Sequence, residues 1–348
     1  MRRVYVGMDI GSKQYAAVAV DVRGKMVDSE VFRTSERNMI SFCEKQKGSV
    51  TVMIEEGELA GWTARTLRPH VERVMVSDPR RNAWVSKAGN KNDPLDAAKL
   101  AELLRLGSYS EVWHPENEDI AEFKLVVQRY DECSKKLART KIQIKALLRR
   151  QGVITSGKGV YGLKGRQAVL DKIESEPVLK LVELEYEMHD FLVCAKAKAL
   201  RILKQQSRKF PVIRRLKNIP GVGPVLAARF VAYVGDPNRF NKRTLASYSC
   251  LGVVKRSSDG SPIGRERLSK AGNYALKDLS RTAFERAKVT KRSNGITEFY
   301  QASLARTNSR TNARLNTQRK ILAIMLAMWR DGTEYCEEMV TGVAFAGS

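Results

Sequence analysis

The sequence predicts an α/β domain at the N-terminus, followed by two largely helical regions. Three observations lead to this prediction. Short runs rich in Val and aromatic residues alternate with turns and helical patterns up to residue 76. Apolar residues then recur every three or four positions from residue 116 to about 151 and again from about 176 to 208, and a Gly- and Pro-containing segment opens the last third. A chain of 348 residues can form two or three domains, each with its own core.

The N-terminal pattern is a run of three strands followed by alternating helix and strand. The expected strands cover residues 4–9, 15–20, 26–33, 50–55 and 71–76. The expected helices between the later strands cover residues 36–46 and 58–69. This order is typical of a ribonuclease H-like domain, in which helices pack on a mixed sheet.

Four acidic residues fall where these elements begin or end. Asp9 and Glu55 each close an apolar run, and Asp93 and Asp96 lie in the stretch KAGNKNDPLDAAKLAELLRL. If residues 94–106 form a helix, positions three apart share one face. Ligands of such sheets gather where strand ends meet helix starts. Four converging carboxylates would hold two Mg²⁺ ions, which clamp both oxygens of an in-line displacement at phosphorus.

Each of these acids also has a purely structural explanation. Asp93 is a good helix N-cap, and Asp96 is a first-turn acid favoured by the helix dipole. Asp9 could simply shape a turn, and Glu55 could be a surface residue at a strand end. Glu56 adjoins Glu55, and the alternation of a strand sends the two to opposite faces, so Glu55 is preferred and Glu56 is the substitute. The conjunction of all four acids favours a two-metal nuclease or strand-transfer site.

The charge balance predicts a polyanionic partner. The chain has 62 Lys and Arg against 38 Asp and Glu, a formal net charge of +24. Nucleic acid is the natural partner because each neutralised phosphate releases counterions, and an anionic membrane surface is the weaker alternative. No stretch approaches the roughly 20 apolar residues that span a bilayer, and no signal peptide is visible. Five scattered cysteines fit the reduced thiols of a cytosolic protein. Together with the basic charge, they predict a cytoplasmic, DNA-associated protein.

The middle region predicts two long helices that form an antiparallel coiled-coil arm, with the Gly-rich stretch GVITSGKGVYGLKGRQ between them. The seam of the first helix is expected at Phe123, Val126, Tyr130, Cys133, Leu137, Thr140, Ile144 and Leu147. The seam of the second is expected at Val178, Leu181, Met188, Leu192, Ala195, Ala199 and Ile202. Such arms commonly mediate oligomerisation. The basic residues of the first helix either track phosphates or are simply solvated.

The last third contains two further features. The segment LKNIPGVGPVLAARFVAYVGD resembles a helix-hairpin-helix, whose Gly turn lets backbone N–H groups approach a phosphate, although any Gly-rich helical hairpin looks similar. Ser257 and Ser258 lie in a polar, flexible segment flanked by basic residues, where a serine is ordinarily a turn residue. The closing helix, NTQRKILAIMLAMWRDG, has a dense apolar face and is expected to pack back on this domain.

The order of the motifs resembles one known family. The motifs are GMDIGSKQYAAVAV, IEEGELAGW, SDPRRNAWVSKAGNKNDPLDAAKLAELL, NIPGVGPVLAARFVAYVGD, and LGVVKRSSDG with RLSKAGNYALK. Together they resemble the DEDD transposases of the Piv-like "one-ten" insertion sequences, also called bridge-RNA-guided recombinases. The resemblance runs from about residue 4 to 335. Its most specific pieces are D-x-x-D-A, from Asp93 to Ala97, and S-K-x-G-N, from Ser269 to Asn273.

The resemblance implies a domain organisation and a set of site residues. It implies a RuvC-like catalytic domain at 1–112, a coiled-coil arm at 113–210 and a C-terminal transposase domain at 211–338. Residues 339–348 lie beyond the resemblance and are expected to form a disordered tail. The implied metal ligands, for Mg²⁺ or Mn²⁺, are Asp9, Glu55, Asp93 and Asp96. The implied nucleophile is Ser257, with Ser258 next. The sequence departs from the family by placing Asp259 where a Gly is usual and Asn92 where a Thr is frequent.

The resemblance also implies a mechanism and partners. The serine attacks a DNA phosphate to give a phosphoserine linkage, while the metal-binding acids stabilise the leaving oxygen. A structured bridge RNA chooses donor and target DNA, and dimers to tetramers form composite sites. Two other functions are weighed against this one: a Holliday-junction resolvase-like nuclease that uses water, and a non-catalytic nucleic-acid-binding protein.

Overall fold

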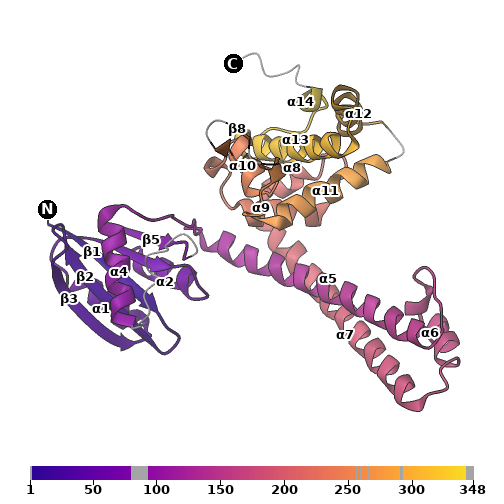
Figure 1. Ribbon diagram of the computed structural model, residues 1–348, viewed down its shortest axis with the longest axis horizontal. Coiled ribbons are helices and arrows are strands. Elements are labelled where there is room, and N and C mark those ends of the chain that lie inside the picture. Colours follow the sequence, from indigo (N-terminus) through magenta and orange to yellow (C-terminus); the bar gives the residue numbers. More distant parts are fainter. Residues whose placement is uncertain are drawn as a thin grey trace. The chain divides into compact units, whose positions relative to one another are not determined.

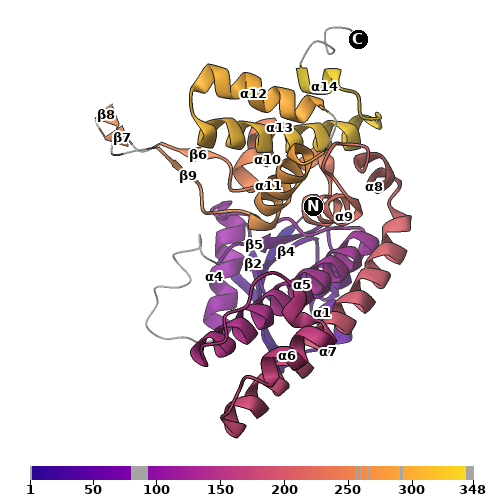
Figure 2. The same ribbon diagram turned by 90° about the vertical axis from the view of Figure 1, so that its right-hand side faces the viewer.

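The computed structural model describes residues 2–79, 93–255, 257–258, 261–262, 264, 266–290 and 293–341. The chain divides into two compact units, Met1–Glu116 and Asn117–Ser348, and each is described by itself (Figures 1 and 2). None of the described helices is long and apolar enough to cross a membrane.

A five-stranded mixed sheet forms the centre of the N-terminal unit. Its strands are β1 (Arg3–Ile10), β2 (Gln14–Asp21), β3 (Met26–Arg33), β4 (Ser49–Glu55) and β5 (Arg73–Ser77). They lie in the order β3-β2-β1-β4-β5. The first three are antiparallel, and β4 runs parallel to both β1 and β5. The predicted strands are confirmed, and the sheet is compatible with a ribonuclease H-like domain.

Helices cover both faces of this sheet (Figure 1). On one face, α1 (Glu36–Glu44) and α2 (Ala60–Leu67) share a core with alternate residues of the central strands, including Met8 and Ile54. On the other face, α4 (Asp93–Leu106) packs Leu100 against Met53. Because successive side chains of a strand point to opposite faces, each central strand contributes to both cores.

Gly7 is a point of close approach between β1 and α4. A Cβ atom at this position would lie 2.0 Å from the carbonyl oxygen of Ala97 and 2.4 Å from the backbone nitrogen of Ala101. Both neighbours are helix backbone, so neither can move aside without displacing α4. The missing side chain of Gly7 therefore sets the distance between the helix and the sheet.

Gly7→Ala should destabilise the N-terminal unit by about 3 kcal/mol or more, because the added methyl group overlaps helix backbone. Thermal or urea unfolding measures the change. Gly57→Ala is the matched control, since a Cβ there has no described atom within 4 Å. Equal melting temperatures for the two variants would contradict the close approach of α4.

The C-terminal unit begins with a long helical hairpin. Its two helices, α5 (Glu118–Arg150) and α7 (Glu176–Gln206), pack against each other along their length (Figure 1). The short helices η1 (Gly159–Tyr161) and α6 (Leu163–Leu170) lie at its far end. The prediction of two long helices joined by a Gly-rich segment is confirmed.

The predicted seam of this hairpin is only partly right. On α5, Val127 and Leu148 are buried in place of the predicted Val126 and Leu147. On α7, Val182, His189 and Leu203 are buried, whereas the predicted Leu181, Met188 and Ile202 are exposed. A strict heptad repeat holds its register only in supercoiled helices, because 3.6 residues per turn drift against a 3.5 repeat.

A second cause of the shifted seam is the contact of α5 with α9 (Pro224–Val234). Asp131 of α5 is buried, and its carboxylate accepts hydrogen bonds from Arg229 Nε at 2.7 Å and from Tyr233 Oη at 3.1 Å. At Asp131, therefore, α5 presents a polar side chain to α9, and a pattern of apolar residues could not predict this contact.

Helices form most of the remainder of this unit. They are η2 (Ser207–Lys209), α8 (Pro211–Leu216), η3 (Pro237–Arg239), α10 (Lys242–Tyr248), α11 (Tyr274–Lys288), α12 (Gly295–Thr307), α13 (Arg310–Asp331) and α14 (Glu338–Thr341). The buried face of α13 includes Ile321, Leu322 and Met325, and this helix packs against α8, α10, α11 and α12. The prediction that the closing helix packs back on its domain is confirmed.

Candidate catalytic site

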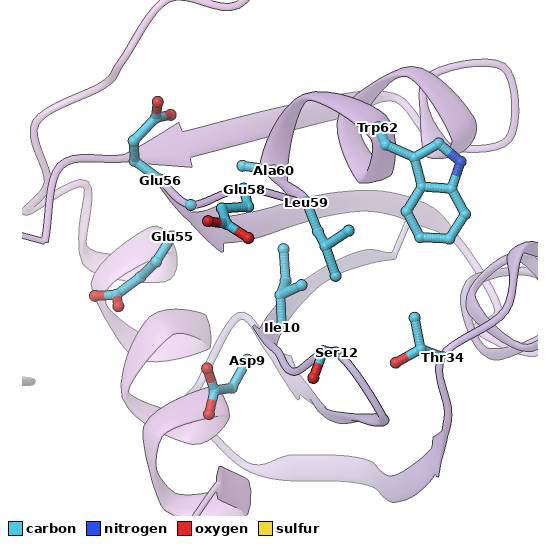
Figure 3. Close-up of a pocket in the computed structure, with 11 residues that line it drawn as sticks. Asp9, Ile10, Ser12, Thr34, Glu55, Glu56, Glu58, Leu59, Ala60 and Trp62 are labelled. Carbon is cyan, nitrogen blue, oxygen red and sulfur yellow. The ribbon is translucent and has the colours of Figure 1, made fainter. Parts of the chain in front are cut away.

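Asp9 and Glu55 occupy adjacent positions at the ends of neighbouring parallel strands. In the ladder between β1 and β4, Gly7 lies opposite Met53 and Met8 opposite Ile54, so Asp9 and Glu55 are the next pair. Neighbouring strands are about 4.8 Å apart. Both residues line one hollow, and their side chains turn to the same side (Figure 3). The structure therefore brings together the two acids that the sequence places at strand ends.

The sheet face to which these two carboxylates belong is the one covered by α4. Gly7 packs on Ala97 and Met53 packs with Leu100, and each acid lies two residues beyond one of these contacts on the same face. Leu103, nearer the end of α4, belongs to the cluster on which Tyr5 packs. The helix therefore runs opposite to β1, and its first turn lies toward Asp9.

Asp93 and Asp96 are in that first turn of α4, as predicted. The carboxylate of Asp96 accepts a hydrogen bond from Lys99 Nζ at 2.8 Å, and only 16% of its side chain is exposed. Asp93 is exposed. Within the described part of the chain, no three carboxylate, imidazole or thiol side chains form a group that could hold a metal ion. The structure thus places Asp9 beside Glu55, whereas the carboxylate of Asp96 forms an ion pair with Lys99.

Glu56 points away from Glu55 (Figure 3). Its backbone N–H donates to the carbonyl oxygen of Ser77 at 3.0 Å, and its carboxylate is hydrogen-bonded to Nε2 of His114. The alternation expected for a strand end is therefore present. This arrangement supports Glu55, rather than Glu56, as the partner of Asp9.

The sequence patterns did not predict one further acid that lines the hollow. Glu58 lines the same hollow as Asp9 and Glu55, in the turn before α2 begins at Ala60 (Figure 3). The expected helix began at residue 58, which assigned this glutamate to a helix start. The available signal was the density of acids in EEGE, directly after the glutamate strand.

Ser257 and Ser258 form the short strand β7 (Ser257–Ser258) in the C-terminal unit, opposite β8 (Ser261–Pro262). A two-stranded ladder of β6 (Val253–Val254) and β9 (Arg267–Leu268) joins this hairpin to the helices (Figure 2). The ion pair between Lys255 and Glu266, at 2.7 Å, links the two sides of the hairpin. The side chains of both serines, and Asp259, lie outside the described residues.

Two family models match this chain. A model of DEDD transposases of the IS110 type matches residues 6–152. A second model, described as transposases of the IS116/IS110/IS902 family, matches residues 213–301. The chain belongs to the IS110 family of transposases.

Individual relatives of this IS110-family transposase match it over most of their length. A protein of insertion element IS110 from Streptomyces coelicolor is 25% identical, over 99% of this chain and 98% of the relative. A protein of insertion element IS116 from Streptomyces clavuligerus is also 25% identical, over 94% and 95%. The transposase for IS1111A from Coxiella burnetii is 24% identical, over 79% and 75%. The first family match spans all four predicted acids, and the second spans both candidate serines.

Proposed function

We propose that this transposase cuts and rejoins DNA through a phosphoserine intermediate, at a site formed by a metal-binding acidic group and Ser257. The observation that supports the proposal is the adjacency of Asp9 and Glu55 at the ends of β1 and β4. Asp93 and Asp96 lie in the first turn of α4, the helix that covers the same face of the sheet. The family membership supplies DNA as the substrate, and the net charge of +24 suits it.

The acids fit a hard divalent cation, Mg²⁺ or Mn²⁺, which prefers carboxylate oxygens. When bound, such an ion polarises the phosphate and stabilises the leaving oxygen. Asp9 and Glu55 would hold it from the sheet, and Asp93 and Asp96 from the helix. Asp96 joins this group only after its carboxylate leaves Lys99, whose ammonium group is now its partner at 2.8 Å.

In the proposed reaction, the Ser257 hydroxyl oxygen forms a bond to phosphorus, and the bond from phosphorus to one sugar oxygen breaks. The serine hydroxyl gives up its proton to solvent, and the sugar oxygen takes up one proton and leaves as a hydroxyl group, so the step is neutral in protons. The phosphoserine ester retains the energy of the broken bond, so a second DNA hydroxyl can displace the serine and restore a DNA strand. The acids and the serine belong to different units of the chain, and catalysis requires them to meet within one chain or between two copies.

A structured bridge RNA of the element is the proposed selector of donor and target DNA. Base pairing then reads the sequence, while protein cations contact the backbones. A strongly basic chain is suited to backbone contacts of this kind, because contacts to phosphates contribute affinity but little sequence specificity.

The second candidate function is a Holliday-junction resolvase-like nuclease, which would use the same acids with water as the nucleophile. The pairing of Asp9 with Glu55 serves either reaction. A strand-exchange assay with labelled element-end DNA, the element's RNA and Mg²⁺ separates the two. We expect rejoined recombinant strands; cleaved strands without any rejoining would favour the nuclease.

The proposed oligomer of two to four copies has a candidate contact surface on α7. Leu181, Leu184, Met188 and Phe191 are all exposed and follow one another at spacings of three, four and three, which is the seam pattern of a coiled coil. Phe191 is 72% exposed. We call these four residues the outer stripe and propose that a second copy of the chain covers it.

Met188→Glu/Phe191→Glu should weaken self-association by about 100-fold or more, since burying each such side chain contributes about 1.5–3 kcal/mol. Light scattering over a range of concentrations measures the mass. The control is Ile154→Glu/Leu163→Glu, which adds the same charges at two exposed apolar residues outside the outer stripe. An unchanged mass in the stripe variant would remove α7 from the interface.

A further inference from the structure

A second hollow, of about 560 Å³, lies in the C-terminal unit where the end of α7 meets α8. Four exposed cationic side chains surround it: Lys204, Arg208, Arg214 and Lys217. Phe210, Pro211 and Ile213 give it an apolar floor. None of the described residues that line it is acidic. We call this feature the basic hollow.

Among the described residues, the cations of the basic hollow lack ion-pair partners. In the described part of the chain, none of the four forms an ion pair. Lys209, in the same stretch, differs from them because it binds Asp119 at 2.6 Å. Like charges held together repel one another, and a bound anion would relieve that repulsion. The arrangement therefore favours a polyanionic ligand.

The floor of the basic hollow is held in place by the arm. The ring of Phe210 packs on that of Phe123 in α5, with ring centroids 4.6 Å apart. Ile213 is buried beside it in α8. A preformed apolar floor below a cationic rim matches a nucleotide unit, whose sugar and base are apolar on their faces and whose phosphate is charged.

The groups around the basic hollow also have a geometry that suits a phosphate. Arg208 and Arg214 carry planar guanidinium groups, which donate two parallel hydrogen bonds to a phosphate. Pro224, the first residue of α9, also lines the hollow, and the N-cap of this helix, Gly223, supplies no side-chain cap. The positive end of the α9 dipole therefore adds to the field of the side chains.

We propose that the basic hollow binds the phosphodiester backbone of a nucleic acid strand. The inference rests on the proposed function, because it assigns one of the surfaces that holds the substrate or the guide. A DNA strand and an RNA strand present the same phosphate chemistry, and the test below distinguishes them.

The test measures binding of the full-length protein to a labelled single-stranded DNA, a single-stranded RNA and a DNA duplex, each of mixed sequence. Chelator is present throughout, so no chemistry occurs. The variant Arg208→Gln/Arg214→Gln removes two charges from the basic hollow. Its control, Lys164→Gln/Lys172→Gln, removes two charges from exposed lysines near the far end of the arm. A third protein, Arg208→Lys/Arg214→Lys, keeps the charge but loses the planar groups.

We expect the Gln variant to bind at least one probe about tenfold more weakly at low salt. Its plot of log affinity against log salt concentration should be shallower by about 1.4 for a single strand or about 1.8 for a duplex. The Lys variant should retain the slope. The probe that is affected identifies the strand as DNA or RNA. If the Gln variant and the lysine control show the same affinity and slope on all three probes, the inference is wrong.

A second measurement guards against indirect effects on folding. Photocross-linking with bromouracil-substituted strands should label peptides that contain residues 204–217 in the wild-type protein, and the Gln variant should lose that label while its melting temperature stays unchanged. Cross-links confined to other peptides would contradict the assignment. Both measurements read binding alone. If the Gln variant loses binding and the wild-type protein forms no serine adduct with DNA, the proposed reaction is wrong but the inference about the basic hollow still holds.

Discussion

Ser257→Ala should form no covalent adduct with DNA and should recombine at least about 10⁴-fold more slowly than the wild-type protein. The reason is chemical: alanine has no hydroxyl group, and loss of a nucleophile is among the largest effects that one substitution has on an enzyme. The measurement is recombinant product formed per hour from labelled donor and target DNA, with the element's RNA and Mg²⁺ present.

Ser261→Ala is the matched control for this experiment. Ser261 lies in the same hairpin, opposite Ser258 in the ladder of β7 and β8, so it tests any effect of losing a serine from the hairpin itself. Ser258→Ala resolves the choice between the adjacent serines. If Ser258→Ala, and not Ser257→Ala, abolishes the adduct, the nucleophile is Ser258. Binding of RNA should be unchanged in all three variants.

Asp9→Asn and Glu55→Gln should each lower recombination by about 10³-fold or more. Each substitution replaces a carboxylate by a neutral amide of the same shape, so the cation loses a charged ligand while the strand ends keep their packing. A factor of 10³ corresponds to about 4 kcal/mol of transition-state stabilisation, which is within the contribution of a bound metal ion. Single-turnover rates over a series of Mg²⁺ concentrations measure the loss.

The controls for these acids are Glu56→Gln and Glu58→Gln, because both glutamates line the same hollow. Activity close to that of the wild-type protein is expected from each. A binding measurement supports the kinetics: Mg²⁺ should raise the melting temperature of the wild-type protein and of both control variants, but not of Asp9→Asn. Loss of activity in Glu56→Gln with normal activity in Glu55→Gln would exchange the roles of the two glutamates.

The sheet was predictable from the sequence because its signal is local. Each strand is a short run of Val, Ile and aromatic residues that ends at a polar turn, and the observed strands agree with the predicted ones to within about two residues at each end. The first turn of α4 was predictable for the same reason, since Asp-Pro marks a helix start. The placement of acids at these ends therefore followed from the sequence.

Features that depend on packing could not be predicted in this way. The pairing of Asp9 with Glu55 follows from the register of β1 and β4, and the closeness of α4 follows from Gly7, which the sequence presents only as one glycine among many. On α5, the buried Asp131 faces α9 and so departs from the predicted apolar seam. Sequence patterns describe one element at a time, whereas these features arise between elements.

Some predictions remain untested. The domain boundaries, the role of each acid and the choice of Ser257 stay predictions. The departures from the family pattern at Asn92 and Asp259, and residues 342–348 of the expected disordered tail, lie outside the described residues. The hairpin position of Ser257 and Ser258 replaces the expected flexible segment with short paired strands, although the side chains of both serines also lie outside the described residues.

A denaturing gel for protein–DNA adducts tests the central proposal most directly. Wild-type protein, Ser257→Ala and Asp9→Asn are incubated with the element's RNA and labelled DNA, with Mg²⁺ or with chelator. The account predicts a labelled band of slower mobility from the wild-type protein with Mg²⁺ only, and no such band from either variant. Cleaved DNA without any adduct in the wild-type lane would contradict the account and make this transposase a hydrolytic nuclease.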